Sequence, residues 1–131
     1  MYRAVCPACG RAVNIPNDGP CPHCGSQITL PRGGLLKIYR MGNFIGVAAA
    51  CSIYLNNTPY GHIGNKETVQ IPLPYGSYLV HMAQGLSRKC NDPTVTLSPQ
   101  DPVACLKMHI RVGAFVNSMI LEPADPASMP E

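Results

Sequence analysis

Two short cysteine motifs near the N-terminus constrain the fold more than any other feature of this sequence. Cys6-Pro-Ala-Cys9-Gly10 is followed, with eleven residues between Cys9 and Cys21, by Cys21-Pro-His-Cys24-Gly25. A tight turn between two cysteines three positions apart points both sulfurs at one metal ion. Backbone N–H groups then point at the sulfurs, and the following glycine lets the turn close. The motifs predict one tetrahedral site with Cys6, Cys9, Cys21 and Cys24 as ligands and a single structural Zn²⁺ as its ion.

The metal is expected to decide whether residues 1–30 fold. A segment of this length buries too little apolar surface to fold alone, whereas structural zinc contributes about 10–16 kcal/mol of apparent binding free energy in small finger peptides. Two disulfides or four free thiols are the alternative reading. We expect a hairpin in which residues 12–15 run out, residues 28–30 run back, and Asn17-Asp18-Gly19 forms the turn. Because four sulfurs are present, His23 is predicted to be a surface residue.

Residues 6–25 resemble the short zinc ribbons found at the N-terminus of many bacterial proteins. The resemblance is specific for a metal site but not for a partner, since that family includes nucleic-acid binders and protein-interaction modules. Rubredoxins carry similar motifs around iron, but they separate them by a longer, aromatic-rich insert that this chain lacks. Ribbons that touch nucleic acid usually present basic and aromatic residues, whereas this one offers Arg3, Arg11, Arg32 and one tyrosine.

The composition changes near residue 34, and the rest of the chain reads as short strands. Gly and Pro account for 26 of the 131 residues and interrupt every helical window. Strands at intervals of roughly ten residues predict an all-β fold, a zinc ribbon joined to an antiparallel immunoglobulin- or transthyretin-like β-sandwich of about seven strands. The expected strands are residues 35–40, 51–55, 60–63, 68–71, 76–83, 94–97, 103–112 and 117–121.

The same reading divides the chain into four parts: a zinc ribbon (1–30), a linker (31–34), the sandwich (35–121) and a disordered tail (122–131). Asn56-Asn57 predicts a tight hairpin turn, since asparagine tolerates positive φ. Strands 35–40 and 117–121 are expected at exposed sheet edges, where they could pair with another chain.

Residues 36–83 resemble PEGA-type and related carboxypeptidase-regulatory-like β-sandwich domains of bacteria. Gly61 matches the glycine that follows a short strand in that pattern. Pro74, Gly76, Tyr78 and Val80 match the Pro-x-Gly-x-Tyr-x-Val element that opens the next long strand. The resemblance implies a non-enzymatic surface or interaction module.

No catalytic constellation is evident, so the chain is predicted not to be an enzyme and no catalytic residue is assigned. The acids of the expected sandwich are Glu67, Asp92 and Asp101, and two of them lie beside prolines in loops. No His-x-Glu, Gly-x-Ser-x-Gly or phosphate-binding glycine-rich motif occurs.

Three cysteines remain outside the motifs. Cys51 shares the parity of apolar neighbours and is predicted to be a core residue. Cys105 shares the parity of charged neighbours and is expected to face solvent or a neighbouring strand. Cys90 follows Arg88-Lys89, cations that would lower its pKa, so it is a candidate redox thiol against the alternative of an inert loop thiol. If their strands pair, His81, His109 and Cys105 could form a second metal site; ordinary surface histidines are the default.

Charge and hydropathy argue against two classes of function, nucleic-acid binding and membrane spanning. Charged residues are only 13% of the chain, and Zn²⁺ bound to four thiolates reduces the formal net charge of +3 to about +1. So small a net charge gives weak support for nucleic-acid binding, and no nucleic-acid-binding residue is assigned. A modest basic face could still form from Arg88, Lys89, Lys107 and Arg111. The longest apolar stretch, residues 44–55, is too short to span a membrane.

The expected function is therefore that of a non-catalytic, cytoplasmic zinc protein that presents a surface to a protein partner. The alternatives are a nucleic-acid-binding ribbon protein and a rubredoxin-like electron carrier or thiol sensor.

Overall fold

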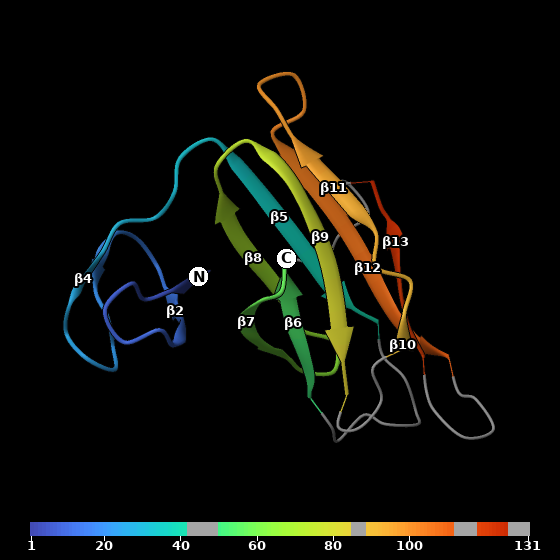
Figure 1. Cartoon of the computed structure of the whole chain (residues 1–131), viewed down its shortest axis with the longest axis horizontal. Helices are drawn as coiled ribbons and strands as arrows, with labels where there is room; N and C mark the ends of the chain where they lie inside the picture. The colour runs from blue at the N-terminus through green and yellow to red at the C-terminus, as the bar shows by residue number, and fades with distance from the viewer. Residues whose placement is uncertain (42–49, 85–88, 112–117, 126–131) are drawn as a thin grey trace.

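The computed structural model describes residues 1–41, 50–84, 89–111 and 118–125, and within these ranges it consists of β-strands without a helix (Figure 1). The all-β prediction is confirmed. A small unit built on the cysteine motifs, here called the cysteine unit (residues 1–30), lies beside a larger two-sheet body, here called the sandwich. None of the described segments is a helix with the length and apolarity needed to cross a bilayer.

The cysteine unit contains two antiparallel strand pairs, one around each motif. In each pair the chain turns back through its motif: Cys6 N–H donates to Arg11 O at 2.9 Å, and Cys21 N–H donates to Ser26 O at 2.7 Å. The pairs are β1 (Tyr2–Val5) with β2 (Ala12–Ile15), and β3 (Gly19–Pro20) with β4 (Gln27–Ile28). The predicted hairpin between residues 12–15 and 28–30 is therefore wrong, because each motif joins the strands that flank it.

The sandwich consists of a five-stranded sheet in the order β10-β13-β12-β5-β8 and a four-stranded sheet in the order β11-β9-β6-β7. Strands along the chain are β5 (Gly34–Arg40), β6 (Cys51–Leu55), β7 (Thr58–Ile63), β8 (Thr68–Leu73), β9 (Gly76–Ala83), β10 (Lys89–Cys90), β11 (Thr94–Leu97), β12 (Val103–Arg111) and β13 (Ser118–Pro123).

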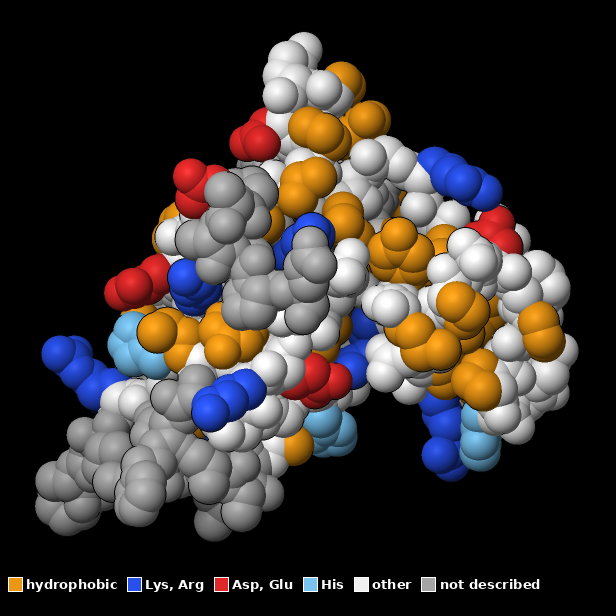
Figure 2. All heavy atoms as spheres, turned by 180° about the vertical axis from the view of Figure 1, so that it is seen from behind, with side chains coloured by type: hydrophobic (Ala, Val, Ile, Leu, Met, Phe, Trp, Pro, Cys, Tyr) orange, Lys and Arg blue, Asp and Glu red, His pale blue; other side chains and the backbone are white. Residues whose placement is uncertain are grey.

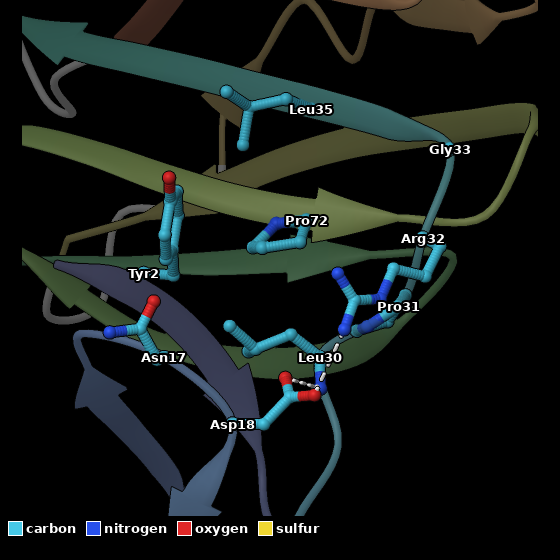
Figure 3. A pocket seen from close by; sticks show the side chains of 9 residues that line it. All are labelled: Tyr2, Asn17, Asp18, Leu30, Pro31, Arg32, Gly33, Leu35 and Pro72. Atoms are coloured by element: carbon cyan, nitrogen blue, oxygen red, sulfur yellow. Dashed lines mark hydrogen bonds and ion pairs between the residues drawn. The ribbon is translucent and has the colours of Figure 1, made fainter.

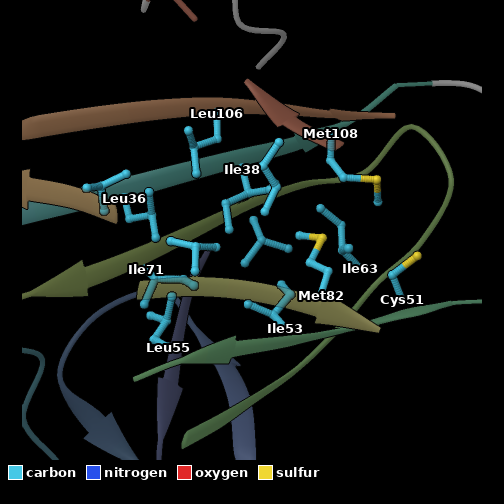
Figure 4. Close-up of a cluster of buried hydrophobic side chains, with 14 of the residues drawn as sticks. Leu36, Ile38, Cys51, Ile53, Leu55, Ile63, Ile71, Met82, Leu106 and Met108 are labelled. Carbon is cyan, nitrogen blue, oxygen red and sulfur yellow. The ribbon is translucent and has the colours of Figure 1, made fainter. Parts of the chain in front are cut away.

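One hydrophobic core lies between the two sheets. Alternate residues of β5, β6 and β8 are buried, as the period of a strand with one covered face requires. Figure 4 shows Leu36 and Ile38 from one sheet facing Ile53 and Met82 from the other, and all four are fully buried. The turn at Asn56-Asn57 has φ angles of 48° and 67°, which confirms the predicted hairpin turn between β6 and β7.

Four sequence expectations about the sandwich need correction. Strand β5 is not at an edge, because it lies between β8 and β12, and its pairing with β12 is parallel rather than antiparallel. Strand β13 pairs with β12 along one side and with the two-residue β10 along the other. The disordered tail was predicted to start at residue 122, which is too early. Glu122 and Pro123 belong to β13, and Ala124 N–H donates to Cys105 O at 2.9 Å. The rest of that tail, 126–131, lies outside the described residues.

Arg3 joins the cysteine unit to the sandwich. Its Nη1 donates to Tyr60 O and His62 O of edge strand β7, each at 2.9 Å, and its Nε donates to Asn14 Oδ1 at 2.7 Å. Only 6% of Arg3 is exposed. Burial lowers the pKa of its guanidinium, and nearby Glu67 opposes that shift. A charged donor thus satisfies carbonyl groups of a strand edge that would otherwise be open to another chain.

A groove of about 460 Å³ follows the same junction (Figure 3). Tyr2 and Leu30 of the cysteine unit line it together with Leu35 and Pro72 of the sandwich. Asp18 stands at its rim, accepting from Leu30 N–H at 2.9 Å and from Arg32 Nη2 at 3.2 Å. These bonds hold the start of the predicted linker against the cysteine unit.

Candidate metal centre

The four motif cysteines meet at one point. Their Sγ atoms all lie within 4.8 Å of one another, with 3.6 Å between Cys6 and Cys24 and 3.9 Å between Cys9 and Cys21. Two sulfurs bound at about 2.3 Å to one tetrahedral ion are about 3.8 Å apart. The residues predicted as ligands therefore form a group that can hold a metal ion.

Backbone N–H groups surround the sulfurs as expected of such motifs. His23 N–H donates to Cys21 Sγ at 3.4 Å, and the N–H groups of Arg11 and Ser26 bond the sulfurs of Cys9 and Cys24. The glycines that close the turns, Gly10 and Gly25, have φ angles of 74° and 81°, which L-residues rarely adopt.

The four thiols influence one another's ionisation strongly. Bonds from the Ser26 N–H and hydroxyl lower the pKa of Cys24 to about 6, and bonds from the N–H groups of Cys24 and His23 lower that of Cys21 despite the opposing desolvation. The Arg11 N–H also acts to lower the pKa of Cys9, but desolvation and the neighbouring thiols raise it to about 11. Four thiolates at this distance repel one another, so a divalent cation is the partner that allows all of them to ionise.

The site is closed on its inner side. Cys6 and Cys21 are buried on the small apolar cluster of the cysteine unit, which also contains Ala4, Ile15, Ile28 and Leu30, whereas Cys9 is half-buried and Cys24 exposed. His23 is exposed at the tip of the second motif and is not part of the ligand group. Four sulfur donors complete a tetrahedron and leave no position for substrate, which is typical of structural sites.

The other three cysteines lie in the sandwich. Cys51 is fully buried in the core, as predicted. Cys105, predicted to face solvent or a neighbouring strand, is only 6% exposed, and its backbone O accepts the N–H of Ala124 from the segment after β13. Cys90 is half-buried in β10, and burial raises the pKa of its thiol, opposite to the shift expected from neighbouring cations. Its redox role stays a prediction.

The second metal group suggested by the sequence does not form as expected. His81 and His109 lie on β9 and β12, which belong to different sheets. Instead, His81 lies with Cys90 and Asp92, whose donor atoms are all within 4.8 Å of one another. Sequence reasoning missed this group because the two-residue β10 is too short for a recognisable pattern, so nothing in the sequence placed Cys90 and Asp92 beside His81 of the preceding strand.

The three acids predicted from the sequence to lie in the sandwich are held in separate places. Glu67 Oε1 accepts the Gly64 N–H at 2.7 Å in the β7–β8 turn, Asp92 bonds His81 after β10, and Asp101 exchanges backbone bonds with Ser98 before β12. The basic residues are similarly scattered: Lys107 lies opposite Glu122 on the neighbouring strand, and the face in Figure 2 shows Lys and Arg side chains dispersed among acidic and hydrophobic ones. Arg88 lies outside the described residues.

Comparison of the chain with models of protein families, with curated proteins and with solved structures finds no match. The resemblances to zinc ribbons and to PEGA-type domains therefore rest on the residues that carry them, and the geometry of the site is the main evidence about function.

Proposed function

We propose that this chain is a non-catalytic zinc protein in which a zinc ribbon, docked on a β-sandwich related to the PEGA-type domains, serves as a structural and protein-interaction module. The observation that carries the proposal is the convergence of four cysteine sulfurs at distances that suit a tetrahedral ion. Zinc is the proposed ion because it favours a closed four-sulfur site and needs no redox chemistry to stabilise the fold.

The state of the cysteines supports a reducing compartment, and we propose the cytoplasm. No disulfide joins any of the seven, and the sulfurs of the four motif cysteines lie together as a group of metal ligands. Reduced thiols grouped around a metal are typical of intracellular proteins, whereas secreted domains of this size more often carry disulfides.

The tips of the two motifs support a role in protein interaction. Pro7, Ala8, Pro22 and His23 are exposed, and hydrophobic side chains gather on the face of the cysteine unit seen in Figure 2. Short apolar residues on a metal-fixed turn lose little conformational entropy on binding, because their backbone is already ordered. Among the described residues of the sandwich, Glu67, Asp92 and Asp101 bond to different turns and strands, whereas general acid–base catalysis requires groups that converge.

In the sandwich, one contact supports the relation to PEGA-type domains. Tyr78 Oη donates to Pro74 O at 2.6 Å, which holds the chain as it enters β9 at the Pro-x-Gly-x-Tyr-x-Val element. Such a bond shapes a strand entry and supplies no catalytic group, as in the tyrosine corners of other sandwiches.

Elemental analysis of the purified chain tests the metal assignment. We expect about one zinc per chain in a colourless protein, retained through dialysis against buffer. Iron with a visible absorption band would favour the electron carrier instead. A chain without metal, with all cysteines alkylated at once in the native state, would remove the basis of the proposal.

Affinity capture from the native host tests the interaction. The tagged wild type is compared with His23→Glu, which places a charge at a motif tip, and with Gln100→Glu, which places the same charge on an exposed loop of the sandwich. We expect one protein partner to be lost with His23→Glu and kept with Gln100→Glu. Recovery of nucleic acid that is released by moderate salt would favour the nucleic-acid alternative.

A further inference from the structure

A second group of metal-ligand side chains lies in the sandwich, outside the cysteine unit. His81 belongs to β9, Cys90 to the adjacent β10, and Asp92 follows β10. One donor atom from each residue lies within 4.8 Å of the other two, and His81 Nδ1 and Asp92 Oδ1 share a hydrogen bond of 2.6 Å. Imidazole nitrogen, thiol sulfur and carboxylate oxygen thus face one small volume.

Hydrogen bonds to both sheets hold this group in place. Asn91, between the two later ligands, exchanges two bonds with Leu121 of β13: its Nδ2 donates to Leu121 O at 2.7 Å, and its Oδ1 accepts the Leu121 N–H at 2.8 Å. Pro93 O, just beyond the group, accepts the N–H of Val80 at 2.9 Å. Two sheets therefore fix the chain segment that carries Cys90 and Asp92, so little ordering remains for a bound ion to impose.

The surroundings of the individual donors suit a ligand role as well. The His81 ring lies against Tyr54, with ring centroids 5.7 Å apart, which limits its rotation. Backbone N–H groups of Met82 and Asp92 bond the Cys90 sulfur, as N–H groups do at the cysteine motifs. The side chains of His81 and Asp92 are 26% and 42% exposed, so an ion can reach them from solvent.

We propose that His81, Cys90 and Asp92 form a second divalent transition-metal site of the zinc class, with three protein ligands and a fourth position for water or an external ligand. Zinc accepts nitrogen, sulfur and oxygen donors at about 2.0–2.3 Å, and three protein ligands with one open position are the arrangement of reactive rather than structural zinc sites. Among the described residues, no further His, Cys, Asp or Glu joins the group.

Binding requires a small and balanced rearrangement. The ion replaces the hydrogen bond between His81 Nδ1 and Asp92 Oδ1, the neutral imidazole binds through Nδ1 with its one proton on Nε2, and the Cys90 thiol gives up its proton, so one proton leaves to solvent as three metal–ligand bonds form. Nitrogen and oxygen ligands of a tetrahedral ion are about 3.3 Å apart, so Nδ1 and Oδ1 need to separate by less than about 1 Å. The site depends on neither the ion of the cysteine unit nor the proposed interaction role.

Equilibrium dialysis of the full chain against micromolar Zn²⁺, with metal and protein quantified, tests the proposal. We expect two zinc ions per wild-type chain and one in His81→Gln, Cys90→Ser and Asp92→Asn. The matched controls His109→Gln and Asp101→Asn, which change the same residue types elsewhere on the sandwich, should keep two. A wild type that binds one ion, or variants that keep two, would overturn the assignment.

A second measurement needs no substitution at the site and follows each cysteine separately. In the wild type, Zn²⁺ added beyond the first equivalent should slow alkylation of Cys90 several-fold, as read by peptide mass spectrometry. Reaction of Cys9 and Cys24 reports the ion of the cysteine unit in the same sample. Unchanged Cys90 reactivity at saturating Zn²⁺ would refute the second site, whereas rapid reaction of Cys9 and Cys24 would refute the first.

Discussion

The contact between Arg3 and Gly61 offers a sharp test of how the cysteine unit is joined to the sandwich. Gly61 lies in β7 between the two carbonyl groups that Arg3 Nη1 bonds, and its φ is 81°. A Cβ at this position would stand 2.8 Å from Arg3 Nη1 and 3.1 Å from the Cβ of Ala12. Gly61→Ala should therefore strain the backbone and displace the guanidinium at the same time.

The magnitudes follow from these two effects. An alanine in the left-handed region costs about 1–2 kcal/mol, and loss of one hydrogen bond from a charged donor adds roughly 1.5–3 kcal/mol, so Gly61→Ala should lower the free energy of unfolding by about 2.5–5 kcal/mol. Arg3→Met keeps the aliphatic volume but removes all three hydrogen bonds, and it should lower the free energy of unfolding by about 3–4 kcal/mol. This loss is smaller than the sum of three such bonds because water can reach part of the carbonyl groups that lose their donor. In the double variant no guanidinium remains to be displaced, so only the backbone strain is added.

The assay is urea unfolding with Zn²⁺ in excess, followed by circular dichroism and tyrosine fluorescence, since the chain has no tryptophan. The double variant should lose roughly 1.5–3 kcal/mol less than the sum of the single losses, since the hydrogen-bond loss of Gly61→Ala is then absent. Gly64→Ala is the control: its Cβ would meet only Glu67 Oε1 at 3.6 Å, and we expect a change within about 0.5 kcal/mol. Additive losses in the double variant would refute the joining role of Arg3.

Three further outcomes are expected. Cys21→Ser, or a strong chelator, should abolish the protection of amide hydrogens in residues 1–30 while β5 and β12 stay protected in hydrogen exchange, because the metal supplies the ordering energy of that unit alone; loss of protection in β12 would contradict this. Gly34→Ala should lower the free energy of unfolding by about 1–3 kcal/mol in urea melts, since its Cβ would lie 2.7 Å from Leu97 Cδ1 in a packed core; an unchanged midpoint would count against the packing. Cys51 should resist maleimide in the native state, because burial raises the pKa of its thiol and the reactive thiolate forms only at higher pH; mass spectrometry that finds it labelled near pH 8 without unfolding would disprove its core position.

Local patterns predicted the features that depend on neighbouring residues. The spacing of the cysteine motifs places two sulfurs on each turn, and the glycine after each motif adopts the positive φ that the turn requires. The alternation in β5, β6 and the part of β12 from Leu106 to Ile110 predicted which side chains are buried, because the faces of a strand repeat every two residues. Cys105 is the exception, since it is buried next to Leu106 against its parity. Asn56-Asn57 formed its hairpin turn because the need for positive φ at two successive positions is a property of those residues themselves.

Which strands pair, and therefore which side chains meet across them, was decided only by the tertiary structure. A strand can satisfy its hydrogen bonds with any partner that extends the same buried face, so β5 could join β12 in parallel after a long crossover, and each cysteine motif could pair its own flanking strands. The four cysteine ligands were recognisable because each pair lies within one turn, whereas His81, Cys90 and Asp92 meet only because β9 and β10 lie side by side. Sequence alone thus determined the local conformations and buried faces, while long-range burial of the core determined the partners.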